Sequence, residues 1–144
     1  MSENTKRRIM VVDDEASVLI TYRLILEQQG YTVGAFSKSA DAIRALEEDE
    51  KYDLVLCDYS LEEQHTGFEV IAAARKRDDC IPAALLTGYA TRDTADEAAS
   101  RQIVIMFKPI EIEEFLATTA KMIRRDDECN EESGQENSGS QTSF

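Results

Sequence analysis

Leu54-Val55-Leu56-Cys57-Asp58 is an uninterrupted apolar run that ends in a carboxylate. A continuous run of this length, unlike an alternating one, is typical of a strand that is buried on both faces of a sheet. Within it, Cys57 is expected to behave as a small buried hydrophobic residue. Four more short apolar runs lie at residues 9–12, 31–36, 83–86 and 103–107. The five runs predict five strands in one sheet.

Stretches with helical periodicity separate these predicted strands. Apolar side chains recur at spacings of three and four residues over residues 18–26 and 112–123, and shorter helical candidates cover residues 39–46, 67–77 and 90–100. Strands that alternate with helices predict an α/β fold, a doubly wound five-stranded parallel sheet with helices on both sides. The length suits the strand order 2-1-3-4-5.

Composition and chain ends set the limits of this domain. A chain of 144 residues that is 42% hydrophobic and 31% charged corresponds to one globular domain. We predict a flexible segment at residues 1–6, a folded domain at 7–125 and a disordered acidic tail at 126–144, because the tail has few apolar side chains to offset its conformational entropy. The polar N-terminus resembles no signal peptide, so a cytoplasmic protein without membrane insertion is expected.

Net charge excludes one class of partner. The chain carries a formal charge of −13, and acidic residues outnumber basic ones in the folded domain as well as in the tail. Direct nucleic-acid binding depends on basic surface patches, so we expect no direct contact with nucleic acid.

Acidic side chains stand where the first and third predicted strands end. Asp13 and Asp14 follow the first strand, and Asp58 ends the third. In the order 2-1-3-4-5 these strands border the crevice where strand order reverses, which is where open α/β sheets bind ligands. Carboxylates at close range repel unless a cation is present, and oxygen ligands without His or Cys suit Mg²⁺. Asp13 and Asp14 could instead cap the first helix, but Asp58 at the neighbouring strand end favours the metal site.

The two remaining strand ends add a hydroxyl group and an amine to the same edge. Strand four ends at Thr87-Gly88, and strand five ends at Lys108-Pro109. A lysine at the end of an apolar strand needs a partner for its ammonium group. We expect this partner to be Asp58, or a group that Asp58 carries.

These four strand ends, at residues 11–15, 54–58, 85–88 and 107–109, together resemble the receiver domain of two-component response regulators over residues 7–125. The resemblance implies a flavodoxin-like fold, Mg²⁺ as cofactor, and phosphorylation by a histidine kinase or a histidine phosphotransfer protein. It also implies a downstream protein target, which the sequence does not name. Such a domain catalyses only its own phosphorylation and dephosphorylation, so it is not an enzyme that turns over a substrate.

The resemblance also implies roles for individual residues. Asp58 would be the phospho-acceptor, and Asp14 would bind Mg²⁺ directly while Asp13 acts largely through water. The backbone carbonyl of Ser60 would complete the protein ligands. Positions 60 and 89 tune the phosphoryl lifetime in the family, and Tyr89 is bulky enough to shade the acceptor and slow hydrolysis.

At the other two strand ends, the resemblance assigns phosphoryl contacts. Thr87 would hydrogen-bond one phosphoryl oxygen and Lys108 would pair with another, and the peptide bond before Pro109 would be cis. Many family members carry an aromatic switch residue where this chain has Ile105. We therefore expect switching through Thr87 and the helix at 90–100, with residues 90–125 as the output surface.

Two departures concern the loop after the acceptor: the residue at position 62, and the length from Asp58 to Gly67, which is one residue more than in the shortest family loops. Glu62 stands where family members often carry proline, and His65, the only histidine, is expected to face solvent.

Two other functions compete with a signalling receiver. A haloacid-dehalogenase-type phosphohydrolase would need a second aspartate at position 60, where this chain has Ser60. A degenerate receiver that binds partners without phosphorylation would be expected to lack some of the site residues, and here all of them are present.

Overall fold

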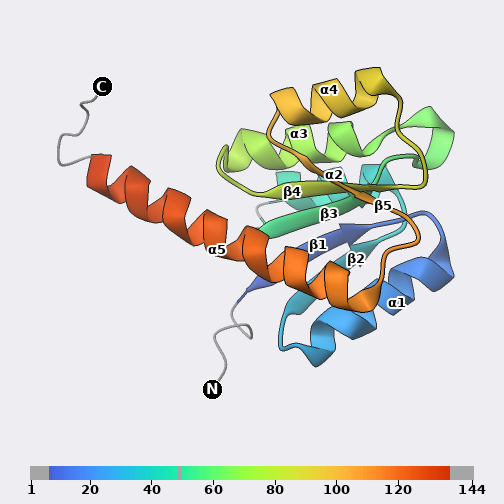
Figure 1. Cartoon of the computed structure of the whole chain (residues 1–144), viewed down its shortest axis with the longest axis horizontal. Coiled ribbons are helices and arrows are strands. Elements are labelled where there is room, and N and C mark those ends of the chain that lie inside the picture. The colour runs from blue at the N-terminus through green and yellow to red at the C-terminus, as the bar shows by residue number, and fades with distance from the viewer. Residues whose placement is uncertain (1–6, 49, 137–144) are drawn as a thin grey trace.

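The five predicted strands form one parallel sheet in a computed structural model of the chain (Figure 1). The structure describes the backbone of residues 7–48 and 50–136, and the side chains of these residues as far as Arg124. The strands are β1 (Arg8–Val12), β2 (Thr32–Phe36), β3 (Leu54–Asp58), β4 (Ala83–Thr87) and β5 (Val104–Phe107). Their order, β2-β1-β3-β4-β5, confirms the predicted order.

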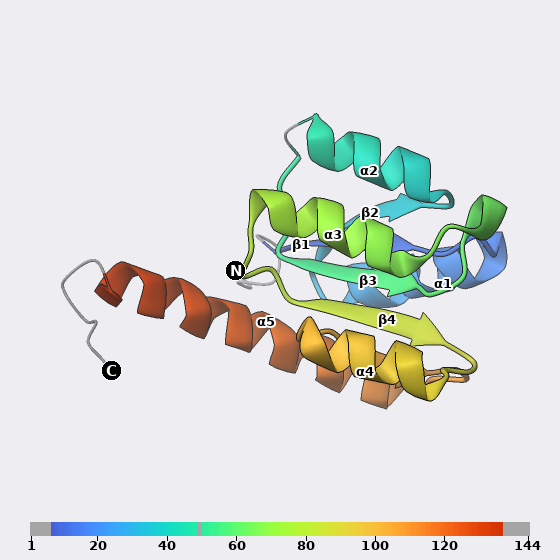
Figure 2. The same cartoon turned by 90° about the horizontal axis from the view of Figure 1, so that it is seen from above.

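Helices cover both faces of the sheet, as Figures 1 and 2 show. They are α1 (Ala16–Gln28), α2 (Ser39–Glu47), α3 (Gly67–Arg77), α4 (Arg92–Ser100) and α5 (Ile112–Glu136), with a short 3₁₀ turn, η2 (Glu62–Gln64), before α3. Helices α1 and α5 lie on one face, and α2, α3 and α4 lie on the other. None of the described helices combines the length and the apolar character that crossing a membrane requires.

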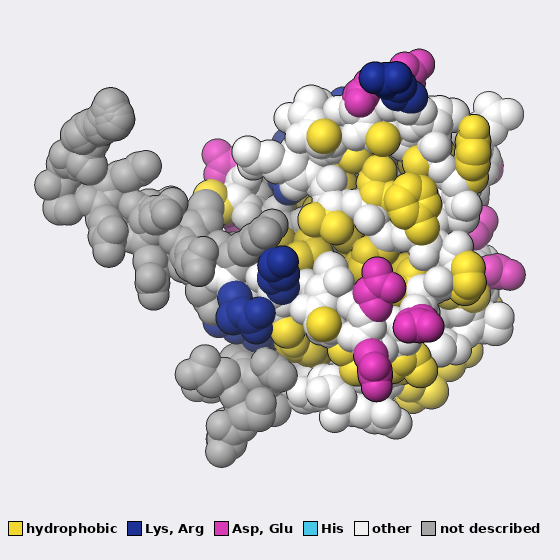
Figure 3. Space-filling model, viewed as in Figure 1, with side chains coloured by type: hydrophobic (Ala, Val, Ile, Leu, Met, Phe, Trp, Pro, Cys, Tyr) yellow, Lys and Arg dark blue, Asp and Glu magenta, His cyan; other side chains and the backbone are white. Residues whose placement is uncertain are grey.

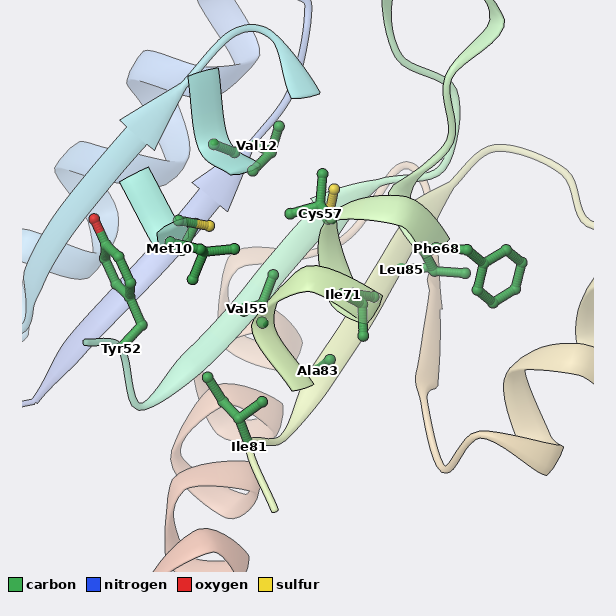
Figure 4. Packing of buried hydrophobic residues seen from close by; sticks show 14 of the residues in the cluster. Met10, Val12, Tyr52, Val55, Cys57, Phe68, Ile71, Ile81, Ala83 and Leu85 are labelled. Atoms are coloured by element: carbon green, nitrogen blue, oxygen red, sulfur yellow. The ribbon is translucent and has the colours of Figure 1, made fainter. Parts of the chain in front are cut away.

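The three central strands, β1, β3 and β4, are buried on both faces because their side chains alternate between two cores. Met10 and Val12 belong to the core beneath α2, α3 and α4, whereas Ile9 and Val11 belong to the core beneath α1 and α5. Figure 4 shows part of the first core, in which Cys57 lies among apolar neighbours. Cys57 is fully buried and is a free thiol, as predicted. The continuous apolar runs of the sequence therefore reflect burial on two sides.

The C-terminal helix extends further than the sequence predicts. We expected disorder from residue 126, but α5 continues to Glu136. The part of α5 up to Ile123 packs against the sheet through Phe115, Met122 and Ile123. Once a packed segment has formed the helix, each added residue gains a hydrogen bond without a new nucleation cost, which explains an extension through a polar sequence. The predicted segments at 1–6 and 137–144 lie outside the described residues.

One buried polar group in the second core has no partner. The Thr119 hydroxyl on α5 is fully buried and forms no hydrogen bond in the described part of the chain. Burying a hydroxyl group without a partner costs free energy, and an apolar group of the same shape avoids that cost.

We therefore expect Thr119→Val to raise the free energy of unfolding by about 1 kcal/mol, as measured by chemical denaturation. Thr118→Val is the matched control, because it makes the same change at the neighbouring, partly exposed position of the same helix. The control should change stability by less than about 0.5 kcal/mol. A Thr119→Val protein that is less stable than the wild type would show that the hydroxyl has a favourable partner.

Candidate functional site

The carboxyl ends of β1 and β3 meet at the point where strand order reverses. β1 pairs with β2 on one side and with β3 on the other, so the chain segments that leave β1 and β3 run over opposite faces of the sheet. This divergence opens the crevice in which α/β sheets bind ligands. The residues that follow β1 and end β3 are the predicted aspartates.

Three carboxylates converge in this crevice. Asp13, Asp14 and Asp58 each offer one oxygen atom, and the three oxygens lie within 4.8 Å of one another. Asp13 is fully buried, Asp58 is 9% exposed, and Asp14 is exposed at the mouth. The prediction that these three residues come together is confirmed.

Lys108 supplies the positive charge of the cluster. Its Nζ atom donates a hydrogen bond to Asp13 Oδ2 at 3.0 Å and lies 3.6 Å from Asp58 Oδ1. The lysine therefore contacts the expected partner and also a second one, Asp13, at shorter distance. Burial lowers the pKa of the Lys108 ammonium, but the hydrogen bond that it donates to Asp13 and the charges of Asp58 and Asp13 outweigh burial, so the pKa lies above its ordinary value.

Asp58 resists ionisation in the protein without bound metal. Burial, followed by the charge of Asp13, raises the pKa of Asp58 to about 6, although Lys108 acts in the opposite direction. One ammonium group therefore does not compensate the whole cluster. A cation bound at the carboxylates would favour the ionised form.

The position of Asp13 decides between its two interpretations. Its Oδ1 atom accepts a hydrogen bond from the backbone N–H of Glu15 at 2.9 Å, and its Oδ2 atom faces Lys108. The N-cap position of α1 is Glu15, and no side chain caps this helix end. The alternative in which Asp13 or Asp14 is the N-cap of α1 is therefore wrong.

The Thr87 hydroxyl is engaged by its own loop. It donates a hydrogen bond to the carbonyl oxygen of Tyr89 at 2.7 Å and accepts one from the backbone N–H of Tyr89 at 3.2 Å. Lys108 is held beside it, because the Lys108 backbone N–H donates to the Thr87 carbonyl at 2.8 Å. The Lys108–Pro109 peptide bond is cis, as the resemblance implies.

Two further predicted positions lie away from the acidic cluster's carboxylates in different surroundings, and for Tyr89 the surroundings differ from the expectation. The Tyr89 side chain is 76% exposed, so it does not cover Asp58 in this conformation. Ile105 on β5 is partly buried and packs against the core beneath α2, α3 and α4. The aromatic residue on the same strand, Phe107, is 57% exposed.

The loop after Asp58 contains a contact that the sequence did not reveal. Glu62 binds the start of α2, where its carboxylate accepts hydrogen bonds from the Ser39 N–H and hydroxyl, both at 2.8 Å. Desolvation raises the pKa of the Glu62 carboxyl group, but these hydrogen bonds outweigh desolvation and lower the pKa to about 2. In the same loop Ser60 forms an antiparallel bridge with Thr66, and the His65 ring lies 2.7 Å from Glu69 near the surface.

Comparison with known proteins identifies the family and supports the fold. Residues 9–120 match the family model of the response regulator receiver domain. The chain belongs to this family. AlgB, an alginate biosynthesis transcriptional regulatory protein of Pseudomonas aeruginosa, is 32% identical over 117 residues, which are 81% of this chain and 26% of AlgB. The luminescence regulatory protein LuxO of Vibrio campbellii is 32% identical over 118 residues, 80% of this chain and 25% of LuxO.

A solved structure shows the same arrangement for an isolated receiver. The response regulator receiver protein from Sinorhizobium medicae has a TM-score of 0.75 and 27% identity, over 83% of this chain and 96% of that one. The present receiver domain spans only about a quarter of the length of AlgB and LuxO.

The raised pKa of Asp58 predicts that metal binding depends on pH. In the folded protein the pKa of Asp58, about 6, lies above its ordinary value of 3.8. Protonation of Asp58 therefore stabilises the folded state fully below about pH 4, and this stabilisation is lost as the pH rises through 6. Mg²⁺ competes with the proton, so its affinity for the receiver should be about tenfold lower at pH 5 than at pH 7.5.

An NMR titration with Mg²⁺ at the two pH values measures this change. Asp58→Asn is the control: it removes the titrating group, so its residual affinity should be nearly the same at both pH values. Equal affinity of the wild type at both pH values would contradict the prediction.

Gly67 determines how closely α3 approaches the acceptor. A Cβ atom at Gly67 would lie 2.7 Å from the Asp58 carbonyl oxygen and 2.6 Å from Leu85 Cδ2. A methyl group at this position would clash with the Asp58 carbonyl oxygen, and only a shift of the backbone could relieve the clash. We therefore expect Gly67→Ala to lower the free energy of unfolding by about 2 kcal/mol. Gly88→Ala is the matched control, since a Cβ atom there meets nothing within 4 Å. Equal stabilities of the two variants in chemical denaturation would refute this interpretation.

Proposed function

We propose that this receiver domain accepts a phosphoryl group on Asp58 in phosphorelay signalling, with Mg²⁺ bound at the acidic cluster. The donor would be a histidine kinase or a histidine phosphotransfer protein, and the site of action the cytoplasm. The observation that supports this most directly is the convergence of three carboxylates and Lys108 at one edge of the sheet. Membership of the receiver family supports the same class of function.

The donor atoms of the cluster suit Mg²⁺. Asp14 is exposed and would bind the ion directly, the buried Asp13 would act largely through water, and Asp58 would offer one oxygen. The backbone carbonyl of Ser60, two residues after Asp58, would complete the protein ligands. When bound, Mg²⁺ would neutralise charge on the transferred oxygens.

The chain's own residues would position the transfer. An Asp58 oxygen forms the new bond to phosphorus while the phosphorus–nitrogen bond to the donor imidazole breaks, and the imidazole leaves with its electron pair. Lys108, whose Nζ atom is 3.6 Å from Asp58 Oδ1, would pair with a phosphoryl oxygen. Because little covalent chemistry falls to the protein, catalysis consists of positioning and electrostatic stabilisation.

Thr87 would connect the phosphoryl group to α4. Its hydroxyl hydrogen is directed to the Tyr89 carbonyl, so a bond to a phosphoryl oxygen requires that this bond be released. The change would then pass along the loop to α4. Ser60 and Tyr89 remain the positions that we propose to tune the phosphoryl lifetime, with Tyr89 able to act only if it moves from its exposed position.

Helix α4 is built to move at one end. Within its nine residues only Ala98 is buried, so little apolar contact holds it. Its C-terminal end is fastened, because the Arg75 guanidinium donates to the carbonyls of Arg101 and Gln102 and also to that of Ile81. The N-terminal end, which follows Thr87, has no such anchor among the described contacts.

An apolar surface near α4 would receive the downstream protein. Figure 3 shows hydrophobic side chains gathered on the face that carries α4, β5 and α5. Exposed apolar side chains from this region include Tyr89, Phe107 and Ile112. Contiguous apolar surface on a small domain is a common mark of a protein-binding site. We therefore propose residues 90–125 as the surface that phosphorylation switches.

Incubation with acetyl phosphate and Mg²⁺ tests the proposed acceptor. We expect intact-mass spectrometry to show one labile phosphoryl adduct on the wild type and none on Asp58→Ala. Asp41→Ala, which removes an exposed acid from α2, is the control and should form the adduct as the wild type does. Chelation of Mg²⁺ should abolish the adduct in both. An adduct of equal yield on Asp58→Ala would overturn the assignment.

A further inference from the structure

Glu62 joins the loop after the acceptor to a helix on the same face of the sheet. Its carboxylate accepts three hydrogen bonds at the start of α2: from the Ser39 N–H at 2.8 Å, the Ser39 hydroxyl at 2.8 Å and the Ala40 N–H at 3.3 Å. Ser39 is 1% exposed, so the contact is shielded from water on that side. Hydrogen bonds to a charged acceptor are stronger than neutral ones.

Helix α2 has no local cap, which explains why this contact forms. The N-cap position is Lys38, whose side chain makes no capping hydrogen bond. The first N–H groups of a helix need acceptors, and a negative charge is favourable there. A carboxylate from 23 residues further along the chain supplies both.

The loop that carries Glu62 depends on such anchors. Glu63 and Gln64 have φ angles of 53° and 66°, in the left-handed region that residues with a Cβ atom seldom occupy. Each such residue costs of the order of 1 kcal/mol, so the loop keeps this conformation only if its surroundings impose it. The Glu62 carboxylate and the buried Leu61 side chain attach this part of the loop to the rest of the fold, in addition to the hydrogen bond from the Tyr59 N–H to the Leu86 carbonyl at the start of the loop.

The same loop orients the carbonyl group proposed as a metal ligand. The Leu61 N–H donates to the His65 carbonyl at 2.9 Å, and the His65 N–H donates to the Glu62 carbonyl at 2.9 Å. The Leu61 N–H and the Ser60 carbonyl belong to one planar peptide group, so the first of these bonds fixes the direction of that carbonyl. A residue that holds the loop in this conformation therefore also holds the Ser60 carbonyl in its direction.

We propose that Glu62 is a positioning residue for the metal site: by anchoring the loop on α2, it holds the Ser60 carbonyl where Mg²⁺ can bind. The inference rests on the proposed function. It differs from a purely structural role in one respect: loss of the anchor should weaken Mg²⁺ binding even where the protein remains fully folded.

Glu62→Gln tests this role, because the amide keeps the shape but loses the charge and one of the two acceptor oxygens. We expect the dissociation constant for Mg²⁺, from an NMR titration of the metal-free protein, to rise roughly tenfold, as for other partners of metal ligands. The Mg²⁺ concentration that half-saturates phosphorylation by acetyl phosphate should rise in parallel, while the rate at saturating Mg²⁺ stays near that of the wild type.

Glu63→Gln is the matched control, because it removes the same charge from the same loop at an exposed residue without a described hydrogen bond or ion pair. It should change Mg²⁺ affinity less than about twofold, since exposed charges are screened. Glu62→Asp keeps the charge but shortens the reach, and it should resemble Glu62→Gln. Ser39→Ala removes a donor from the α2 side, and it should weaken Mg²⁺ binding alone but add little in the Glu62→Gln background.

Two results would overturn the inference. The first is equal Mg²⁺ affinity of Glu62→Gln and wild type, with or without a loss of stability. The second is an equal loss in Glu62→Gln and Glu63→Gln, which would assign the effect to charge alone. If Glu62→Gln does not fold, Glu62→Asp and Ser39→Ala decide by the same affinity measurement. A wild type that binds no Mg²⁺ or forms no adduct on Asp58 refutes the proposed function instead, so the two failures are distinguishable.

Discussion

The repulsion between Asp13, Asp14 and Asp58 is the constraint on which the rest of the structure depends. Three carboxylate oxygens within 4.8 Å, two of them on residues that are hardly exposed, oppose folding unless positive charge is close. Lys108 supplies one charge, bonded to Asp13 and 3.6 Å from Asp58. This one charge does not compensate the cluster, and burial together with the charge of Asp13 still raises the pKa of Asp58. A site that stays under-compensated in this way is prepared for a divalent cation.

The buried strands of the sheet hold the carboxylates of this cluster close together. β1 is apolar and fully buried from Ile9 to Val12, and β3 from Leu54 to Cys57, so their carboxyl ends cannot move apart without opening two cores. Gly67 lets the start of α3 lie against the Asp58 carbonyl, and the Lys108 N–H joins β5 to the end of β4. The clustered side chains thus stand at the ends of rigid strands, and the loops beyond them carry the residues of the proposed switch.

Sequence reasoning found the elements that depend on local pattern and on topology. Continuous apolar runs revealed the five strands, and the strand order placed Asp13, Asp14, Asp58, Thr87 and Lys108 at one edge. It could not find contacts that depend on the path of a loop. The carboxylate of Glu62 reaches Ser39 across 23 residues, and the exposure of Tyr89 depends on side-chain orientation. The helical extension of α5 to Glu136 was missed because composition reports the lack of a core partner but not propagation from a packed helix.

Rigidity and mobility are divided between two loops that leave adjacent strands. The loop after β3 is fastened on α2 by Glu62 and closed by its own hydrogen bonds, which suits a segment that must present a ligand at a fixed position. The loop after β4 contains the hydrogen bond from the Thr87 hydroxyl to the Tyr89 carbonyl, which the hydroxyl would have to release in the proposed contact with a phosphoryl oxygen. It leads to α4, which has one buried residue and is anchored by Arg75 at its far end. In the proposed switch, a helix held at one end and released at the other would pivot rather than detach, so a small movement at Thr87 would change the surface near residue 90 while both cores remain packed.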